Sequence, residues 1–345
     1  MHKTWLIILI SVACLPVHQA GAFQTGEQSK RSTPASGDPV MLQYAHLSVL
    51  PYTSLDRLAY QSLRAREIDI EPVPISAHVA RFHELNKPNY NRVAIISGLG
   101  AGTGIGIHYY MQNAWWSGLR GPFHYREAFT YANNLDKFGH VYAGYLTSFV
   151  FFRMVNWTGL NESRSVWYGA SLGLLFQLNV EVKDGFSTRW GFERWDAIAN
   201  LIGASFFVAR HYIQPLQYFQ LKFSYYPSPR YGEVRWFAED TDKVQNWIDD
   251  YEGHTYWISF RAGRFLKNTV NAPDWLKFIN IAGGWSLSDF REHTEFYLAL
   301  DWNLEELPGS NWYLRRLWEG LDMLKLPAPA VRLAPGGAVW YGVYL

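Results

Sequence analysis

The sequence predicts an α+β protein, in which an N-terminal bundle of about four to six short apolar helices precedes a small antiparallel β-rich C-terminal region. Apolar segments recur between about residues 90 and 220, and short aromatic segments bounded by Gly, Asn or Asp follow from about residue 250. Aromatic residues make up 17% of the 345 residues, with 16 Trp, 22 Tyr and 21 Phe. This content favours either a large aromatic core or a surface at the boundary between membrane and water.

Residues 1–22 have the pattern of an export signal peptide. Lys3 supplies the positive start, Trp5 to Leu15 form the apolar run, and Ala20-Gly21-Ala22 is a small-residue cleavage site. In the alternative interpretation, Cys14 becomes a lipidated N-terminus, because Val12-Ala13-Cys14 is a partial lipobox. We therefore expect export to the bacterial envelope, in a periplasmic or membrane-associated position, and the sequence leaves the outer membrane open as the final location.

Three regions follow the signal peptide. Residues 23–42 are rich in Gly, Ser, Thr, Pro and Gln and are expected to form a disordered tether. Residues 43–220 are expected to form the helical domain, and residues 221–345 the β-rich aromatic region.

The first apolar helix is expected from Val93 to Met111. It contains Gly98, Gly102 and Gly106 at intervals of four residues, which places a strip without side chains on one helix face. Such a strip predicts close packing against a neighbouring helix.

Three further apolar segments are expected to be helical: His140–Val155, Val166–Val180 and Ala197–Ile213. Each has roughly 15 to 17 residues, whereas a membrane-spanning helix needs about 20 predominantly apolar residues. They are therefore better suited to a buried bundle or an interface than to full spans, although a membrane domain of short helices stays open.

The C-terminal region is expected to contain strands, because several short segments combine aromatic and β-branched residues. These segments are Tyr256–Phe260, Phe278–Ala282, Thr294–Leu300 and Ala338–Leu345.

The composition argues against nucleic acid and nucleotide as partners. The chain has 31 basic and 30 acidic side chains, so its net charge does not favour polyanions. The glycines near Gly98, Gly100 and Gly102 lack the spacing of a dinucleotide-binding loop, and no Gly-Lys-Ser/Thr sequence follows them.

Charged and amide side chains lie at the ends of three of the apolar segments. Asp136 and His140 share one helix face at a spacing of four residues, as do Asp196 and Asn200. Glu181 and Asp184, at the end of the middle segment, are three residues apart. Because charges are costly away from water unless they are paired or used, we expect these helix ends to meet in one polar site.

Three roles for this site stay open. It is an ion-paired scaffold, an acid/base site in which Asp136 orients His140, or a divalent-metal site. One histidine with several carboxylates suits Mg, Mn or Ca better than structural zinc. The catalytic candidates are Asp136, His140, Glu181, Asp184 and Asp196; the metal-ligand candidates are His140, Glu181 and Asp184. The binding candidates are Lys137, Lys183, Arg189 and Asn200, of which the lysines are most simply counter-charges and Arg189 is suited to a phosphate.

The run Asp136-Lys137-Phe138-Gly139-His140 resembles the D-K-x-x-H motif of the YfiM-like family, which comprises predicted periplasmic lipoproteins of bacteria. Two later runs are similar to that family's continuation: Glu181-x-Lys183-Asp184-Gly185-Phe186-Ser187 and Trp195-Asp196-x-x-Ala199-Asn200-x-x-Gly203-Ala204. The upstream Ala114-Trp115-Trp116 and Pro122-Phe123-His124-Tyr125 resemble its longer members, and a more distant likeness is to VanZ-like membrane proteins. Over about residues 90–215, the resemblance implies an envelope location and a helical core, but no established activity.

Two functions of different class follow from these observations. In the first, the chain is a non-enzymatic envelope factor whose polar cluster locks the helices, while its aromatic surface meets membrane lipid or an envelope protein. In the second, it is an envelope hydrolase or transferase acting on a lipid-linked or cell-wall substrate, with His140 as general base or metal ligand. The first is favoured, because no nucleophile motif or complete catalytic triad accompanies the polar residues.

Overall fold

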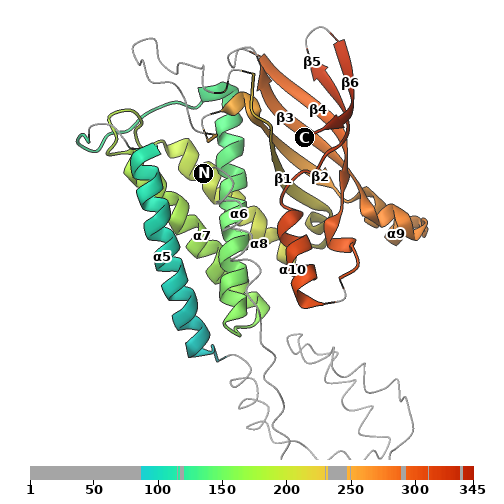
Figure 1. The fold of residues 1–345 in the computed structure, drawn as a ribbon, viewed down its shortest axis with the longest axis horizontal. Helices are drawn as coiled ribbons and strands as arrows, with labels where there is room; N and C mark the ends of the chain where they lie inside the picture. Colours follow the sequence, from blue (N-terminus) through green and yellow to red (C-terminus); the bar gives the residue numbers. More distant parts are fainter. Residues whose placement is uncertain are drawn as a thin grey trace, which may run out of the picture. The chain divides into compact units, whose positions relative to one another are not determined.

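The computed structural model describes residues 87–114, 116, 120–229, 231, 247–248, 250–288, 293–309, 311–334 and 337–345. The expected signal peptide, the tether, Cys14 and residues 43–86 of the expected helical domain lie outside these residues. In the described part, four long helices precede a six-stranded antiparallel sheet (Figure 1), which confirms the α+β class.

The four long helices are α5 (Tyr90–Ala114), α6 (Leu135–Trp157), α7 (Glu162–Asp184) and α8 (Arg194–Tyr212). Each of the last three extends beyond the apolar segment from which it was expected, because the polar residues at its end are also helical. Asp136 and Asp196 thus lie in the first turns of α6 and α8, and Glu181 lies in the last turn of α7.

Glycines allow α6 to approach its two neighbours closely. A Cβ atom on Gly203 of α8 would lie 2.0 Å from the carbonyl oxygen of Val141, and one on Gly169 of α7 would lie 2.4 Å from Cα of Phe152. By contrast, a Cβ on Gly98 or Gly102 of α5 would meet no described atom within 4 Å. The described residues therefore do not show the expected packing on α5, and the close contacts lie along α6 instead.

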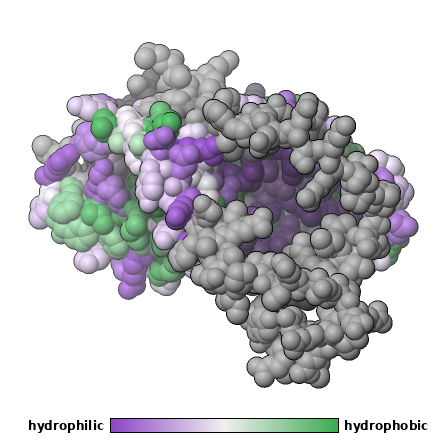
Figure 2. All heavy atoms as spheres, turned by 90° about the horizontal axis from the view of Figure 1, so that it is seen from below, coloured by the Kyte–Doolittle hydropathy of each residue, from purple (hydrophilic) through white to green (hydrophobic). Residues whose placement is uncertain are grey.

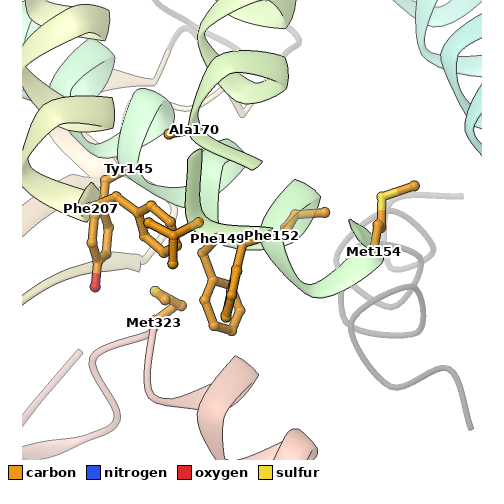
Figure 3. Close-up of a cluster of buried hydrophobic side chains, with 9 residues drawn as sticks. Tyr145, Phe149, Phe152, Met154, Ala170, Phe207 and Met323 are labelled. Atoms are coloured by element: carbon orange, nitrogen blue, oxygen red, sulfur yellow. The ribbon is translucent and has the colours of Figure 1, made fainter. Parts of the chain in front are cut away.

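An aromatic core fills the space between α6, α8 and a segment near the C-terminus (Figure 3). The rings of Tyr145, Phe149 and Phe152 on α6 lie beside Phe207 of α8, and Met323 reaches them from the chain that follows α10 (Trp312–Leu321). Tyr142 of α6 donates a hydrogen bond to the carbonyl oxygen of Met323 at 2.8 Å. The helical region and the C-terminal region therefore share one core.

The sheet follows the order of the sequence, and each strand pairs antiparallel with the next. Its strands are β1 (Phe219–Tyr225), β2 (His254–Phe260), β3 (Ile279–Ser288), β4 (His293–Trp302), β5 (Ala328–Ala334) and β6 (Gly337–Tyr344). The sequence pattern located β2, β3, β4 and β6, but it missed β1 and β5 as well as the short helices α9 (Ala262–Val270) and α10.

Each face of the sheet has a distinct chemistry. One row of paired residues across it consists of Leu221, Ile258, Gly283, Leu298, Val331 and Trp340, and a second of Phe223, Tyr256, Trp285, Phe296 and Leu333. We call the side that carries these rows the outer face. The opposite, inner face carries a buried apolar cluster around Trp257 and Tyr297 and, beside it, buried charged and polar side chains such as Lys222, Asn280 and Asp301.

Among the described residues, α6 packs on the outer face mainly over β1, β2 and β3. Tyr142 stacks on Phe223 with ring centroids 5.6 Å apart, and Phe138 lies 4.2 Å from the ring of Trp285. On β4, Phe296, Leu298 and Leu300 continue the same face, yet about half of the surface of each is exposed. The apolar face thus extends beyond the helix that packs on it.

None of the helices in the described residues has the length and apolar character needed to cross a bilayer. Several nevertheless expose large apolar side chains, including Leu175 on α7 and Ile202 on α8. In Figure 2, which shows the molecule from below, green apolar side chains lie next to purple polar ones on the left side, where the helices are. The helices therefore combine buried polar ends with apolar outward surfaces.

Candidate functional site

The first turns of α6 and α8 and the last turn of α7 meet at one place. The chain enters α6 through the short η1 segment (Tyr131–Asn134), in which Ala132, Asn133 and Asn134 have positive φ angles of 49°, 47° and 67°. Asn tolerates this left-handed conformation better than most residues. The sharp entry buries Leu135 fully and starts α6 so that Asp136 and Lys137 lie inside the protein.

Lys137 lies at the centre of an ion-pair network. Its Nζ atom is 2.8 Å from Oδ2 of Asp136, 2.5 Å from Oδ1 of Asp196 and 2.8 Å from Oε1 of Glu193. None of these four side chains is more than 10% exposed. Asp136 and Asp196, in the first turns of α6 and α8, also complement the positive ends of the helix dipoles.

His140 lies one turn further along α6 and faces the same carboxylates. Its Nδ1 atom is 3.2 Å from Oε1 of Glu181 and 3.3 Å from Nδ2 of Asn200. Its Nε2 atom lies 3.7 Å from Oδ1 of Asp136 and 3.6 Å from Oδ2 of Asp196, beyond ordinary hydrogen-bond length. With 22% of its side chain exposed, His140 is also more open to solvent than the acids around it.

Two neutral side chains complete the network. Asn200 of α8 is fully buried and donates from Nδ2 to Oε1 of Glu181 at 3.0 Å. Tyr251, in the short η3 segment (Tyr251–Gly253) just before β2, donates its hydroxyl hydrogen to Oδ1 of Asp136. We call the eight residues of this network the helix-end cluster: Asp136, Lys137, His140, Glu181, Glu193, Asp196, Asn200 and Tyr251.

The crowding of acids shifts the pKa values inside the cluster. Burial, together with the neighbouring Asp136 and Glu181 carboxylates, raises the pKa of Asp196 to about 8. Burial on its own would lower the pKa of His140, but the carboxylates of Asp196, Asp136 and Glu181 raise it well above its usual value. Burial likewise opposes ionisation of Asp136, yet His140 and Lys137 bring its pKa below the usual value.

These shifts reflect an excess of negative charge. The cluster contains four carboxylates and one lysine, so even a protonated His140 leaves more acidic than basic groups. Buried charge of one sign is unfavourable unless it is compensated. The arrangement therefore favours uptake of positive charge, either as protons on His140 and Asp196 or as a cation.

Two of the sequence candidates lie in a different environment. Oδ1 of Asp184 accepts a hydrogen bond from the indole Nε1 of Trp116 at 2.6 Å. Lys183 lies 2.8 Å from Nδ1 of His108 on α5, and its Nζ atom lies 4.9 Å from the centre of the Trp116 ring. These contacts link the end of α7 to α5 and Trp116.

Arg189 lies in the loop between α7 and α8. Its backbone carbonyl accepts a hydrogen bond from the side chain of Arg126 at 2.9 Å, and its backbone N–H donates to Oγ of Ser187 at 3.3 Å. These contacts give the loop its local structure, and a role in phosphate binding stays a prediction.

The sequence pattern did not identify Glu193 or Tyr251 as members of the site. Glu193 precedes Asp196 by three residues, and this helical spacing could have identified it. Tyr251 is 115 residues from Asp136 in the sequence, and no local spacing could have predicted their contact.

Comparison with known proteins adds one relationship. No curated protein and no solved structure matches the chain at a significant level. The distant likeness to VanZ-like proteins gains no support, whereas the likeness to predicted periplasmic lipoproteins is confirmed and supports export to the cell envelope. Residues 125–211, which carry α6, α7 and α8, match the family described as predicted periplasmic lipoprotein (DUF2279).

Proposed function

We propose that this chain is a non-enzymatic factor of the bacterial envelope that binds the surface of a membrane through the outer face of its sheet. In this proposal, the helix-end cluster fastens the helices to the sheet and so holds that face in position. The partner is membrane lipid.

The inverted polarity of the sheet carries the proposal. Along β4, Phe296, Leu298, Leu300 and Trp302 point outward and are 43% to 54% exposed, whereas the alternating Asp301 is 1% exposed. A sheet that faces water on one side normally has the opposite arrangement, with apolar residues inside and polar residues outside.

The uncovered part of the outer face extends over several strands. We call it the apolar sheet surface and define it by Ile258, Ile281, Phe296, Leu298, Leu300, Trp302, Leu333 and Trp340, which are all at least 43% exposed. Contiguous apolar surface of this kind marks a site of contact with protein or membrane. Removing the exposed half of each large side chain from water is worth about 1 kcal/mol, so eight together suffice for stable contact with lipid.

Charge on the inner face supports the same interpretation. Lys222, which is 1% exposed, forms ion pairs at 2.8 Å with Asp301 and at 2.9 Å with Asp322. The sheet thus keeps its ionised groups on the side away from the apolar sheet surface, as contact with hydrocarbon requires.

Flotation with neutral phosphatidylcholine vesicles tests this function. The full chain should carry Cys14→Ser, so that a lipid anchor cannot mediate binding. We expect this protein to float with vesicles, and Leu298→Glu to reduce the bound fraction at least tenfold. Ser163→Glu, which adds the same charge at an exposed position on α7, should bind as the parent does. Equal flotation of both variants, or no flotation of the parent, would refute lipid contact through this surface.

The second candidate function is a hydrolase that uses His140, which is the best exposed ionisable member of the helix-end cluster. The neighbouring carboxylates raise its pKa and so favour the protonated ring, which suits a general acid better than the expected general base. Assays of ester and phosphodiester hydrolysis with the wild type and His140→Gln would support this function only if turnover depends on His140.

A further inference from the structure

We infer that the helix-end cluster binds one divalent transition-metal ion between Asp136, His140 and Asp196. The inference does not depend on contact between the sheet and lipid. It differs from the ligand set that the sequence favoured, since Glu181 contacts the far side of the imidazole ring and Asp184 pairs with Trp116.

The three ligand atoms are already close together. One donor atom from each of Asp136, His140 and Asp196 lies within 4.8 Å of the others. The separations of 3.6 and 3.7 Å from Nε2 are too long for hydrogen bonds. They agree with two ligands that share an ion, because bond lengths of about 2.0 to 2.2 Å place neighbouring ligands roughly 3 to 3.7 Å apart.

Lys137 and Glu181 contact the three proposed ligands from outside, so that one donor atom of each ligand lies beside the space next to Nε2 of His140. Lys137 binds Oδ2 of Asp136 and Oδ1 of Asp196, and the other oxygen of each carboxylate lies 3.7 or 3.6 Å from Nε2 of His140. Oδ1 of Asp136 also accepts the Tyr251 hydroxyl hydrogen, which leaves it a second lone pair for an ion. Nδ1 of His140 lies 3.2 Å from Glu181 and 3.3 Å from Nδ2 of Asn200, and the tautomer that donates from Nδ1 to Glu181 has the lone pair of Nε2 on the side of those oxygens. A carboxylate behind the metal-binding histidine is a recurrent arrangement in metal sites.

The charges of the cluster also favour a cation. Its four carboxylates outnumber the single lysine. A divalent ion bound to neutral imidazole would compensate more of the excess negative charge than one proton does. Mn²⁺, which the sequence also favoured, accepts both imidazole and carboxylate, and Zn²⁺ is added as a second ion to test because imidazole suits it, although the sequence did not favour structural zinc.

Metal titration of the full chain carrying Cys14→Ser, after dialysis against EDTA, tests the inference. Binding of Mn²⁺ should be followed by the loss of the electron paramagnetic resonance signal of free Mn²⁺, and binding of Zn²⁺ by calorimetry. We expect one ion per chain and a higher melting temperature with the ion bound. His140→Gln and Asp196→Asn should each weaken binding about tenfold or more.

His211→Gln is the matched control, because His211 also faces a carboxylate, at 3.7 Å from Oε1 of Glu162, but lies outside the cluster. It should bind Mn²⁺ as the parent does. Electron spin echo modulation of the unsubstituted complex should show coupling of Mn²⁺ to an imidazole nitrogen, so the result does not depend on the folding of variants. Absence of this coupling, absence of stoichiometric binding of either ion, or unchanged affinity in His140→Gln would overturn the inference.

Discussion

The hydroxyl of Tyr251 donates a hydrogen bond to Asp136 and thereby joins the segment before β2 to the first turn of α6. Both side chains are buried, and Asp136 is at the same time paired with Lys137. The helix-end cluster is therefore a joint between helices and sheet as well as a junction of three helices.

The Tyr251–Asp136 bond should be measurable as an energetic coupling. Tyr251→Phe should lower the free energy of unfolding by about 1.5 to 3 kcal/mol, because it removes a hydrogen bond to a charged group. In a double-mutant cycle with Asp136→Asn, urea denaturation should give a coupling of at least about 0.5 kcal/mol. Additive effects would mean that the two residues do not support each other.

Removal of the central lysine should be more damaging. Lys137→Met leaves Asp136, Glu193 and Asp196 without their shared counter-charge, so we expect a loss of about 3 to 5 kcal/mol in unfolding free energy. Lys183→Met is the matched control on α7, since Lys183 pairs with His108 outside the cluster. Chemical denaturation that gives similar values for both variants would show that the cluster does not depend on Lys137.

The close contact between α6 and α8 gives a second stability test. Gly203→Ala places a Cβ atom 2.0 Å from the carbonyl oxygen of Val141, so the helices must separate and the melting temperature should fall. Gly102→Ala on α5 meets no described atom within 4 Å and should stabilise its helix by up to about 1 kcal/mol. Thermal melts in which both changes have the same sign would contradict this packing.

The stability of the metal-free protein should fall as the pH rises above neutrality. His140 has a raised pKa in the folded state, so its stabilising contribution is complete below its usual pKa of 6.5 and is lost as the pH rises through the higher folded value. Asp196, whose pKa is raised from 3.8 to about 8, also loses stabilising free energy as the pH rises between these two values. Urea midpoints between pH 6 and 9 should therefore fall more steeply in the wild type than in His140→Gln, whereas parallel curves would exclude this linkage.

The sequence predicted the helical core and the convergence of polar helix ends, because both follow from local periodicity. Asp136 and His140 share a face through their spacing of four residues, and the structure brings both to Asp196. Asp184 shows the limit of such reasoning. Its spacing from Glu181 is helical, yet the two carboxylates have different partners, and Asp184 bonds to Trp116.

The pattern could not predict what depends on tertiary pairing. Strand β1 contains Gln220, Lys222 and Ser224 at alternate positions, and these polar residues are buried on the inner face. The usual pattern of a strand has apolar residues on the buried face, so a strand with polar residues on that face is not recognised from its sequence. The Tyr251–Asp136 contact likewise arises only when the sheet packs against α6.

The most direct test of the proposed function is an environment-sensitive fluorophore on the apolar sheet surface. The chain has a single cysteine, which Cys14→Ser removes. In that background, Leu298→Cys allows a nitrobenzoxadiazole label to be attached at position 298, and Ser163→Cys at position 163 as a control. Addition of phosphatidylcholine vesicles should increase and blue-shift the emission of the label at position 298, while the label at position 163 should stay unchanged. An unchanged spectrum at position 298, with the protein folded, would contradict the proposal that this face contacts lipid.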